Sequence, residues 1–183
     1  MWRKRQNIKP EDERVIKDTA AARTRTMNRA VKLLAAKPRS VGELRERLLE
    51  KNWTNNEIVD SVIAKLEEYK YLDDLQFASD MAASKLRQKP QGKRKLQQAM
   101  SRKKLSKENV DSAIISAFEK MPEEELIDRA IEKRLRLKGN PETQEDTKKF
   151  YDHLLRQGFD FDLIRSKISG IMSGELREEA DHE

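Results

Sequence analysis

The feature of this sequence that most constrains its fold is a pattern of apolar residues that occurs three times. The segments run from Leu44 to Val62, from Leu96 to Ile114 and from Phe150 to Ile168. The second segment follows the first at an interval of 52 residues, and the third follows the second at 54. Self-similarity at a fixed interval is typical of repeat architectures, in which each repeat is one supersecondary unit.

Within each copy, the spacing predicts two helices joined by a tight turn. Leu44 and Leu48 are four residues apart, and Ile58 and Val62 repeat that spacing on the next helix. Three sets of equivalent residues define the turn. Asn52, Lys104 and Gly158 take the left-handed position after a helix end; Trp53, Leu105 and Phe159 supply an apolar residue under the turn; Thr54, Ser106 and Asp160 are N-caps. Thr54 with Glu57, and Ser40 with Glu43, can each form a capping box.

An additional helix precedes each of these pairs. The predicted ranges are 26–36, 74–88 and 122–138. Asp73 or Asp74 caps the second of them, and Pro122 takes the first helical position of the third. No strand-like alternation extends over more than a few residues. The chain is therefore expected to be all-α, with three tandem three-helix repeats that form an elongated, curved array.

The boundaries follow from the same pattern. The predicted repeats cover residues 26–72, 73–118 and 119–172, and the second of them is the most basic. Residues 1–25 form a basic N-terminal tail with a possible short helix, and residues 173–183 form an acidic C-terminal tail.

Composition argues against an enzyme. The chain has no cysteine, which removes disulfides and thiolate chemistry, and its two histidines lie far apart in the sequence. It has no glycine-rich phosphate loop, zinc-ligand set or nucleophile elbow. We therefore expect a binding protein without cofactor or metal. No apolar run is long enough to span a bilayer and no secretory signal is present, so we expect a cytoplasmic protein that does not bind membranes.

The charge is concentrated in one window. The net charge is +6, yet residues 81–107 contain no acidic side chain and ten basic ones. These candidate binding residues are Lys85, Arg87, Lys89, Lys93, Arg94, Lys95, Arg102, Lys103, Lys104 and Lys107. Runs of charge are usually solvated helix faces, but a run without any acid favours a surface that binds phosphate or carboxylate groups.

Two further basic groups are weaker candidates. Lys133, Arg134, Arg136 and Lys138 follow a glutamate-rich segment, and Arg3, Lys4, Arg5 and Lys9 form a basic arm near the N-terminus. The first group can equally be a solvated face. The second is more typical of a weak anion contact than of a specific site.

A different function remains open at this point. Three-helix units also occur in helix–turn–helix transcriptional regulators, and the helix that begins near Thr54 could serve as a recognition helix. That helix carries Glu57, Asp60, Glu67 and Glu68, which the phosphates lining a DNA groove would repel.

With these residues in view, the sequence resembles the RecX family of bacterial regulators of the RecA recombinase over about residues 26–172. The strongest stretches are Tyr71-Leu72-Asp73-Asp74 with Phe77-Ala78, and Gly92-Lys93-Arg94-Lys95-Leu96 followed by Met100 and Lys103-Lys104-Leu105-Ser106. The sequence departs from the family pattern at Lys70 and Lys104, where the family commonly has glycine.

The resemblance implies a non-catalytic regulator that binds the RecA–DNA filament. Such a protein suppresses ATP hydrolysis, strand exchange and co-protease activity, and so modulates recombination, DNA repair and the SOS response. The resemblance also implies weak binding of single- or double-stranded DNA without sequence specificity, and we expect a monomer. A DNA-binding transcriptional regulator of the helix–turn–helix type is the alternative.

Overall fold

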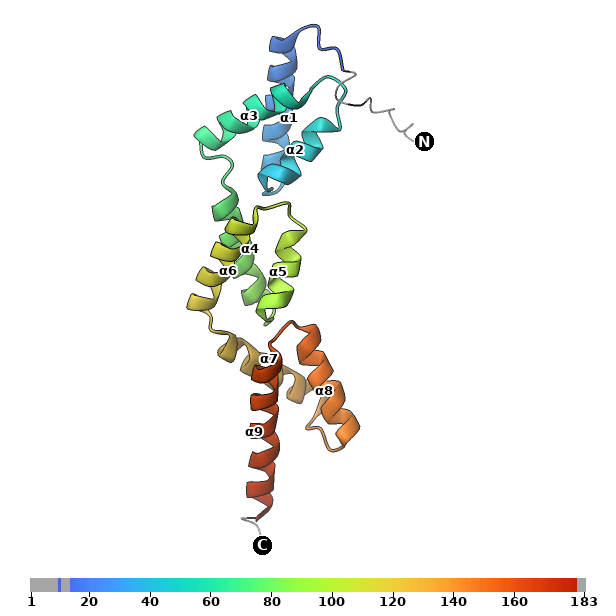
Figure 1. Cartoon of the computed structure of the whole chain (residues 1–183), viewed down its shortest axis with the longest axis vertical. Coiled ribbons are helices and arrows are strands. Elements are labelled where there is room, and N and C mark those ends of the chain that lie inside the picture. The colour runs from blue at the N-terminus through green and yellow to red at the C-terminus, as the bar shows by residue number, and fades with distance from the viewer. Residues whose placement is uncertain (1–9, 11–13, 181–183) are drawn as a thin grey trace. The chain divides into compact units, whose positions relative to one another are not determined.

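The computed structural model describes residue 10 and residues 14–180, and it places side chains as far as residue 170. Arg3, Lys4, Arg5 and Lys9 of the basic arm lie outside the described residues. The described part consists of α-helices joined by short turns, without strands (Figure 1). The helices are α1 (Thr19–Ala36), α2 (Val41–Leu49), α3 (Asn56–Glu68), α4 (Asp74–Gln88), α5 (Lys93–Ser101), α6 (Lys107–Lys120), α7 (Glu123–Lys138), α8 (Gln144–Arg156) and α9 (Phe161–Ala180).

The chain divides into two compact units. The first holds the chain up to Phe77 together with the turn Lys103–Ser106, and the second holds Ala78–Arg102 and the chain from Lys107 onward. In the first unit, α1, α2 and α3 pack against one another. Their core contains Ala30, Leu44, Leu48, Val59, Val62, Ile63, Leu66 and Leu72. The predicted i,i+4 faces of α2 and α3 are therefore the buried ones.

The helix α1 is longer than predicted. It begins at Thr19 rather than at residue 26, and the carboxylate of Asp18 caps it by accepting from the Ala21 N–H at 2.9 Å. Its buried residues are Ala22, Thr26 and Ala30. Because these side chains are small or polar, the apolar periodicity of the helix is weak in the sequence.

The N-cap of α2 is the predicted residue, whereas the N-cap of α3 is not. The Ser40 hydroxyl caps α2 by accepting from the Glu43 N–H at 3.1 Å, as predicted. The cap of α3 is Asn55, whose side chain accepts from the Ile58 N–H at 3.0 Å, so the prediction of Thr54 was wrong. Thr54 is buried instead, and its hydroxyl accepts from Thr26 at 3.1 Å.

In the second unit, α5 packs on α6, and α7, α8 and α9 pack together. Leu96 and Met100 of α5 are fully buried, as are Leu154 of α8 and Ile164 of α9. The α9 backbone stays helical as far as Ala180. Most of the segment predicted as an acidic tail, residues 173–183, therefore belongs to a helix.

The turns after α5 and α8 have the predicted left-handed residue. Lys104 has a φ of 56° and Gly158 a φ of 87°. Asn52 was wrongly predicted to adopt this conformation, because the non-glycine residues with positive φ in the described chain are Lys70 and Lys104. Pro122 likewise lies one residue before α7 rather than at its first position.

The same set of polar contacts occurs in both units, and we call it the polar joint. It connects the start of a helix pair to the turn of the next repeat. In the first unit, the Ser40 hydroxyl at the start of α2 donates to the Lys103 carbonyl, and Lys103 Nζ lies 2.9 Å from Glu43 Oε1. In the second unit, the Gly92 N–H at the start of α5 donates to the Gln157 carbonyl at 3.0 Å, and Lys95 Nζ donates to Gln157 Oε1 at 2.8 Å. These residues are equivalent at the repeat intervals of 52 and 54. The same contact therefore links the first helix pair to the turn of the second, and the second pair to the turn of the third.

Candidate binding surface

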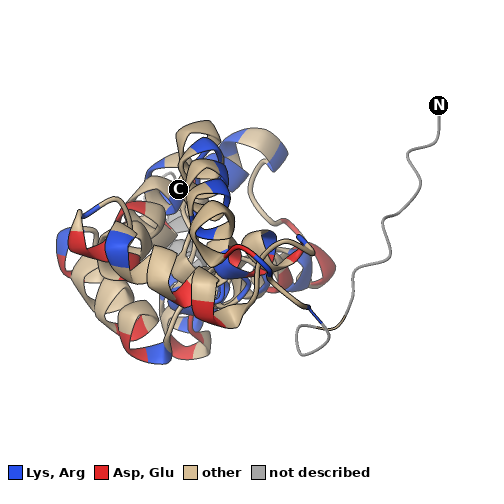
Figure 2. Cartoon of the chain, turned by 90° about the horizontal axis from the view of Figure 1, so that it is seen from above, with Lys and Arg blue, Asp and Glu red and all other residues tan. Residues whose placement is uncertain are grey.

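The ten basic residues of the window come from three helices and their turns. Lys85 and Arg87 lie on α4, Lys93–Lys95 begin α5, and Lys107 begins α6. Lys89 and Arg102 follow the ends of α4 and α5. Lys103 and Lys104 belong to the first compact unit, whereas the other eight belong to the second. A ribbon coloured by charge shows both basic and acidic positions on the helices (Figure 2).

Four of the ten basic residues have acidic partners that the window itself lacks. Lys103 and Lys104 lie 2.9 Å from Glu43 and Glu46 of α2. Lys93 lies 3.6 Å from Glu123, and Arg94 lies 3.9 Å from Asp160. The absence of acids along the sequence therefore does not leave these four cations uncompensated in space, which corrects the interpretation drawn from the window alone.

Lys95 occupies an intermediate position. Its side chain is half-buried against the end of α8, where its ammonium group donates to Gln157. Burial, and to a lesser extent the charge of Lys89, lowers the pKa of Lys95. Its role in the joint makes it a structural residue first and a binding residue second.

Five basic residues of the window form no ion pair within the described chain. They are Lys85, Arg87, Lys89, Arg102 and Lys107. Four of them are exposed, and Lys85 is half-buried. These side chains can therefore bind an anion without first giving up an internal carboxylate.

Lys89 also lies at a small pocket of about 240 Å³ in the second unit. The pocket is lined by Lys89, Pro90, Ala130, Lys133, Arg134, Leu137, Lys138, His153 and Gln157, none of which is acidic. Three of the four cations of the α7 group thus share a pocket with Lys89 of the basic window. They are Lys133, Arg134 and Lys138. Arg136, the fourth, does not line this pocket.

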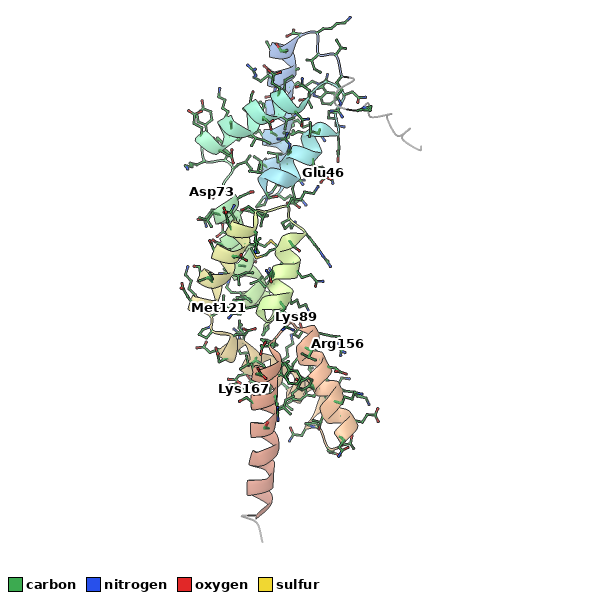
Figure 3. The ribbon with its side chains drawn as sticks, viewed as in Figure 1. Glu46, Asp73, Lys89, Met121, Arg156 and Lys167 are labelled. Atoms are coloured by element: carbon green, nitrogen blue, oxygen red, sulfur yellow. The ribbon has the colours of Figure 1, made fainter. Side chains whose placement is uncertain are left out.

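His153 reports the positive potential of this pocket. Its pKa is lowered, first by burial and then by the charges of Arg134, Arg156, Lys89 and Lys95. Lys89 follows the end of α4 and Arg156 ends α8 (Figure 3), and the charges of both act on His153. A cleft lined by one sign of charge concentrates its field and attracts counter-ions.

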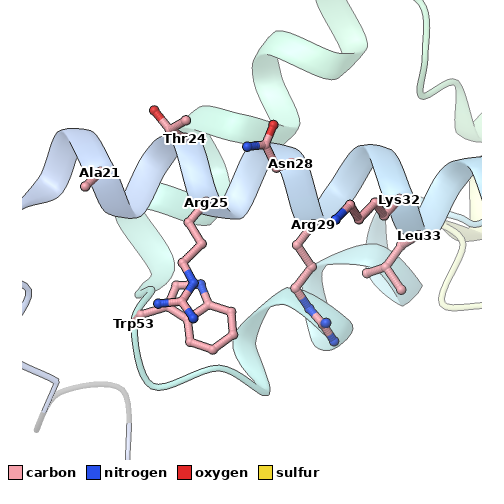
Figure 4. A pocket seen from close by; sticks show the side chains of 8 residues that line it. All are labelled: Ala21, Thr24, Arg25, Asn28, Arg29, Lys32, Leu33 and Trp53. Atoms are coloured by element: carbon pink, nitrogen blue, oxygen red, sulfur yellow. The ribbon is translucent and has the colours of Figure 1, made fainter.

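Sequence reasoning missed a second basic site, on α1. Residues 19–42 contain no acidic side chain and six basic ones, a signal of the same kind as the window at 81–107. Within it, Arg25, Arg29 and Lys32 line an open groove together with Trp53 (Figure 4). The site escaped notice because α1 was predicted to begin at residue 26, which places Arg25 in a tail.

Each of the three repeats is similar to a domain of a known protein family. Models of the first, second and third three-helix domains of RecX match residues 27–66, 73–114 and 122–168. The chain belongs to the RecX family. The regulatory protein RecX of Chlorobium limicola is 35% identical over 141 residues, which cover 76% of this chain and 85% of that protein. The regulatory protein RecX of Chlorobaculum tepidum is 31% identical over 150 residues, which cover 81% and 89%.

Solved structures agree with this fold. RecX from Lactobacillus salivarius superposes with a TM-score of 0.73 at 19% sequence identity, covering 82% of this chain and 97% of that one. The prediction of an all-α chain built from three RecX-type three-helix repeats is therefore confirmed. Among the helices of the described residues, none is both long and apolar enough to cross a membrane.

Proposed function

We propose that this RecX-family chain binds the filament that RecA forms on DNA and inhibits the activities of that filament. These activities are ATP hydrolysis, strand exchange and co-protease function, so the chain modulates recombination and DNA repair. The observation that carries the proposal is the match of all three repeats, in order, to the three domains of the regulatory protein RecX. A protein that acts in this way needs no catalytic site of its own.

The ten basic residues of the window are the proposed contact residues. The eight in the second compact unit form the proposed contact surface, and Lys103 and Lys104 add contacts in the first unit. The five without ion pairs, Lys85, Arg87, Lys89, Arg102 and Lys107, contribute most, because a partner can contact them without breaking an internal pair. The cations of the α7 pocket extend this surface. Its target is the phosphates of DNA or an acidic surface of RecA. Direct DNA binding by such a surface is weak and independent of sequence, because contacts to phosphates carry no base information.

The helix–turn–helix alternative is less well supported by the surface of the first repeat. Glu57, Asp60, Glu67 and Glu68 are all exposed on α3, the helix that would have to enter the major groove. Asp60 is held by Arg45, which also donates to Asn56 at 2.8 Å. An acidic recognition helix would be repelled by the phosphates on both sides of the groove.

The proposal is tested by measuring ATP hydrolysis by RecA on single-stranded DNA while this protein is titrated in. We expect hydrolysis to fall with increasing protein and to reach a low plateau. Unchanged hydrolysis at a several-fold excess over the filament would show that the proposal is wrong. Selection of one duplex from a random pool would instead support the transcriptional regulator.

A further inference from the structure

The groove on α1 has the composition of a binding site. It has a volume of about 660 Å³ and is lined by Ala21, Thr24, Arg25, Asn28, Arg29, Lys32, Leu33 and Trp53. All of these residues except Trp53 come from α1, and Trp53 comes from the turn between α2 and α3 (Figure 4). Arg25 and Arg29 extend from the side of α1 on which Trp53 lies, and Thr24 and Asn28 extend from the other side. The volume lies within the range of about 300–1,000 Å³ that is usual for ligand sites.

The groove is positively charged. Arg25, Arg29 and Lys32 follow one another at helical spacing, and no acidic side chain lines the groove. Arg23 and Lys37, which belong to the same acid-free stretch, do not line it. Of the cations in the acid-free stretch 19–42, the fold therefore places three in the groove and the others outside it.

Arg25 and Trp53 form a stacked pair. The Arg25 Cζ atom lies 3.8 Å from the centroid of the Trp53 ring, so the guanidinium group rests on the face of the indole rather than at its edge (Figure 4). Arg25 is exposed, whereas Trp53 is half-buried. A planar cation is therefore held flat against one ring, with its outer face available. Arginine planes stack on aromatic rings and on nucleobases alike.

The other two cations are held to different degrees. Arg29 donates to the Arg47 carbonyl at 3.4 Å and lies 3.8 Å from Glu50, so its guanidinium group is anchored at the side of the groove. Lys32 is exposed and forms no ion pair within the described residues. Thr24 and Asn28 are exposed beside them and add polar groups that can hydrogen-bond a sugar or a base.

We propose that the α1 groove binds a short segment of single-stranded nucleic acid. One base stacks on the guanidinium group of Arg25, and the phosphates on either side lie against Lys32 and Arg29. The stacked platform favours a nucleic acid over an acidic peptide, because a carboxylate has no aromatic face to stack and gains from the cations alone. The groove belongs to the first compact unit and shares no residue with the ten cations of the proposed filament surface.

Trp53 provides a direct measurement. The chain has two tryptophans, so the variant Trp2→Phe leaves Trp53 as the single indole emitter. Titration of this protein with oligo(dT), without RecA, is expected to change the Trp53 emission in a saturable manner. An oligo-glutamate peptide of similar charge serves as the comparison. An equal response to both would assign the groove to an acidic protein partner, and the absence of any response to oligo(dT) would contradict the proposal.

A pair of matched variants places the binding in the groove. Arg25→Gln/Lys32→Gln removes the platform and one phosphate contact, whereas Arg23→Gln/Lys37→Gln removes the same charge from exposed positions outside the groove. By anisotropy of a labelled oligo(dT), the first variant should bind about fivefold more weakly or worse. The slope of log affinity against log salt should decrease by about 0.7 in magnitude. The second variant should retain most of the affinity. Equal losses in both variants would mean that only net charge matters and would overturn the proposal. Because RecA is absent, this result is independent of the ATPase test.

Discussion

At the scale of single residues, two lysines occupy backbone conformations that glycine adopts more readily. Lys70 ends the turn after α3 with a φ of 60°, and Lys104 ends the turn after α5 with a φ of 56°. For residues other than glycine, the left-handed conformation costs about 1–2 kcal/mol. Both are positions where the sequence departs from the glycine that is common in the family it resembles. Lysine in place of glycine thus preserves both turns but lowers the stability of the fold.

Lys70→Gly should therefore stabilise the protein. Lys70 is exposed, and replacing it relieves the left-handed strain, so we predict that the free energy of unfolding increases by about 0.5–1 kcal/mol. Denaturant unfolding measures this change. Lys65→Gly is the matched control. Lys65 lies inside α3, where glycine is unfavourable, so this variant should lose about 1 kcal/mol in the free energy of unfolding. A loss of stability in Lys70→Gly would contradict the left-handed backbone conformation of Lys70.

His153 should titrate below the usual range for histidine. Burial and the neighbouring cations hold its pKa down in the folded chain, so the unfolded chain takes up the proton first as the pH falls. The free energy of unfolding should then decrease as the pH falls below about 6.5, and His153→Gln should flatten this dependence. NMR titration of His153 measures this pKa directly. Added salt should raise the His153 value, because it screens the cations. A His153 pKa at or above the usual value for histidine, about 6.5, would contradict the positive potential of the pocket.

Residue identity predicted some local details of the fold and not others. Ser40 was recognised as a cap because one suitable residue precedes the apolar pattern of α2. At α3, Thr54 and Asn55 are both suitable, and the choice depends on Thr26, whose hydroxyl pairs with Thr54 in the interior. That partner lies 28 residues away, so no local pattern could indicate it.

At the scale of elements, the repeated joint depends on close backbone approach. A Cβ atom added to Gly92 would lie 2.2 Å from the Gly158 carbonyl oxygen, and one added to Gly158 would lie 2.5 Å from the Lys95 N atom. Both glycines are thus required for α5 to approach the end of α8. In the first unit, Gly42 has the same role, since its added Cβ would meet Lys104 at 2.6 Å.

Gly92→Ala should consequently weaken the second unit. The clash is with backbone atoms, which cannot move aside as a flexible side chain can, so we predict a loss of about 1–3 kcal/mol in the free energy of unfolding. Gly170→Ala in α9 is the control. No atom lies within 4 Å of its added Cβ, and alanine favours helix, so this variant should gain about 0.5–1 kcal/mol. Equal stability of the two variants would contradict the close backbone contact between Gly92 and Gly158.

Helices with large apolar residues were predicted closely, and α1 was not. The ranges of α4 and α7 agree with the sequence pattern to within one residue, because Leu86 of α4 and Leu126, Ile127 and Ile131 of α7 are large apolar residues on the buried faces. The buried face of α1 uses Ala22, Thr26 and Ala30, which contribute little to an apolar pattern. The missed first turns of α1 also concealed Arg25 and with it the groove.

At the scale of the whole molecule, the distribution of charge in space is what the sequence could not provide. The window at 81–107 was visible as a run without acids, but the partners of Lys103 and Lys104 lie on α2, about 60 residues earlier in the chain. Tertiary structure thus separates cations used for internal pairing from cations left for a partner. Exposed ion pairs contribute only about 0–1 kcal/mol each, so even the paired cations remain available to a strongly anionic target.

Inhibition of RecA by matched variants tests most directly whether the unpaired cations carry binding to the RecA filament. We would titrate three proteins into RecA hydrolysing ATP on single-stranded DNA: the natural chain, Lys85→Gln/Arg87→Gln/Lys89→Gln, and Lys120→Gln/Lys148→Gln/Arg165→Gln, which loses the same charge from exposed positions elsewhere in the second unit. We predict that the first variant needs about tenfold more protein for half-inhibition, equivalent to about 1.4 kcal/mol, while the second stays close to the natural chain. Indistinguishable inhibition curves for the two variants would show that the unpaired cations do not carry this binding.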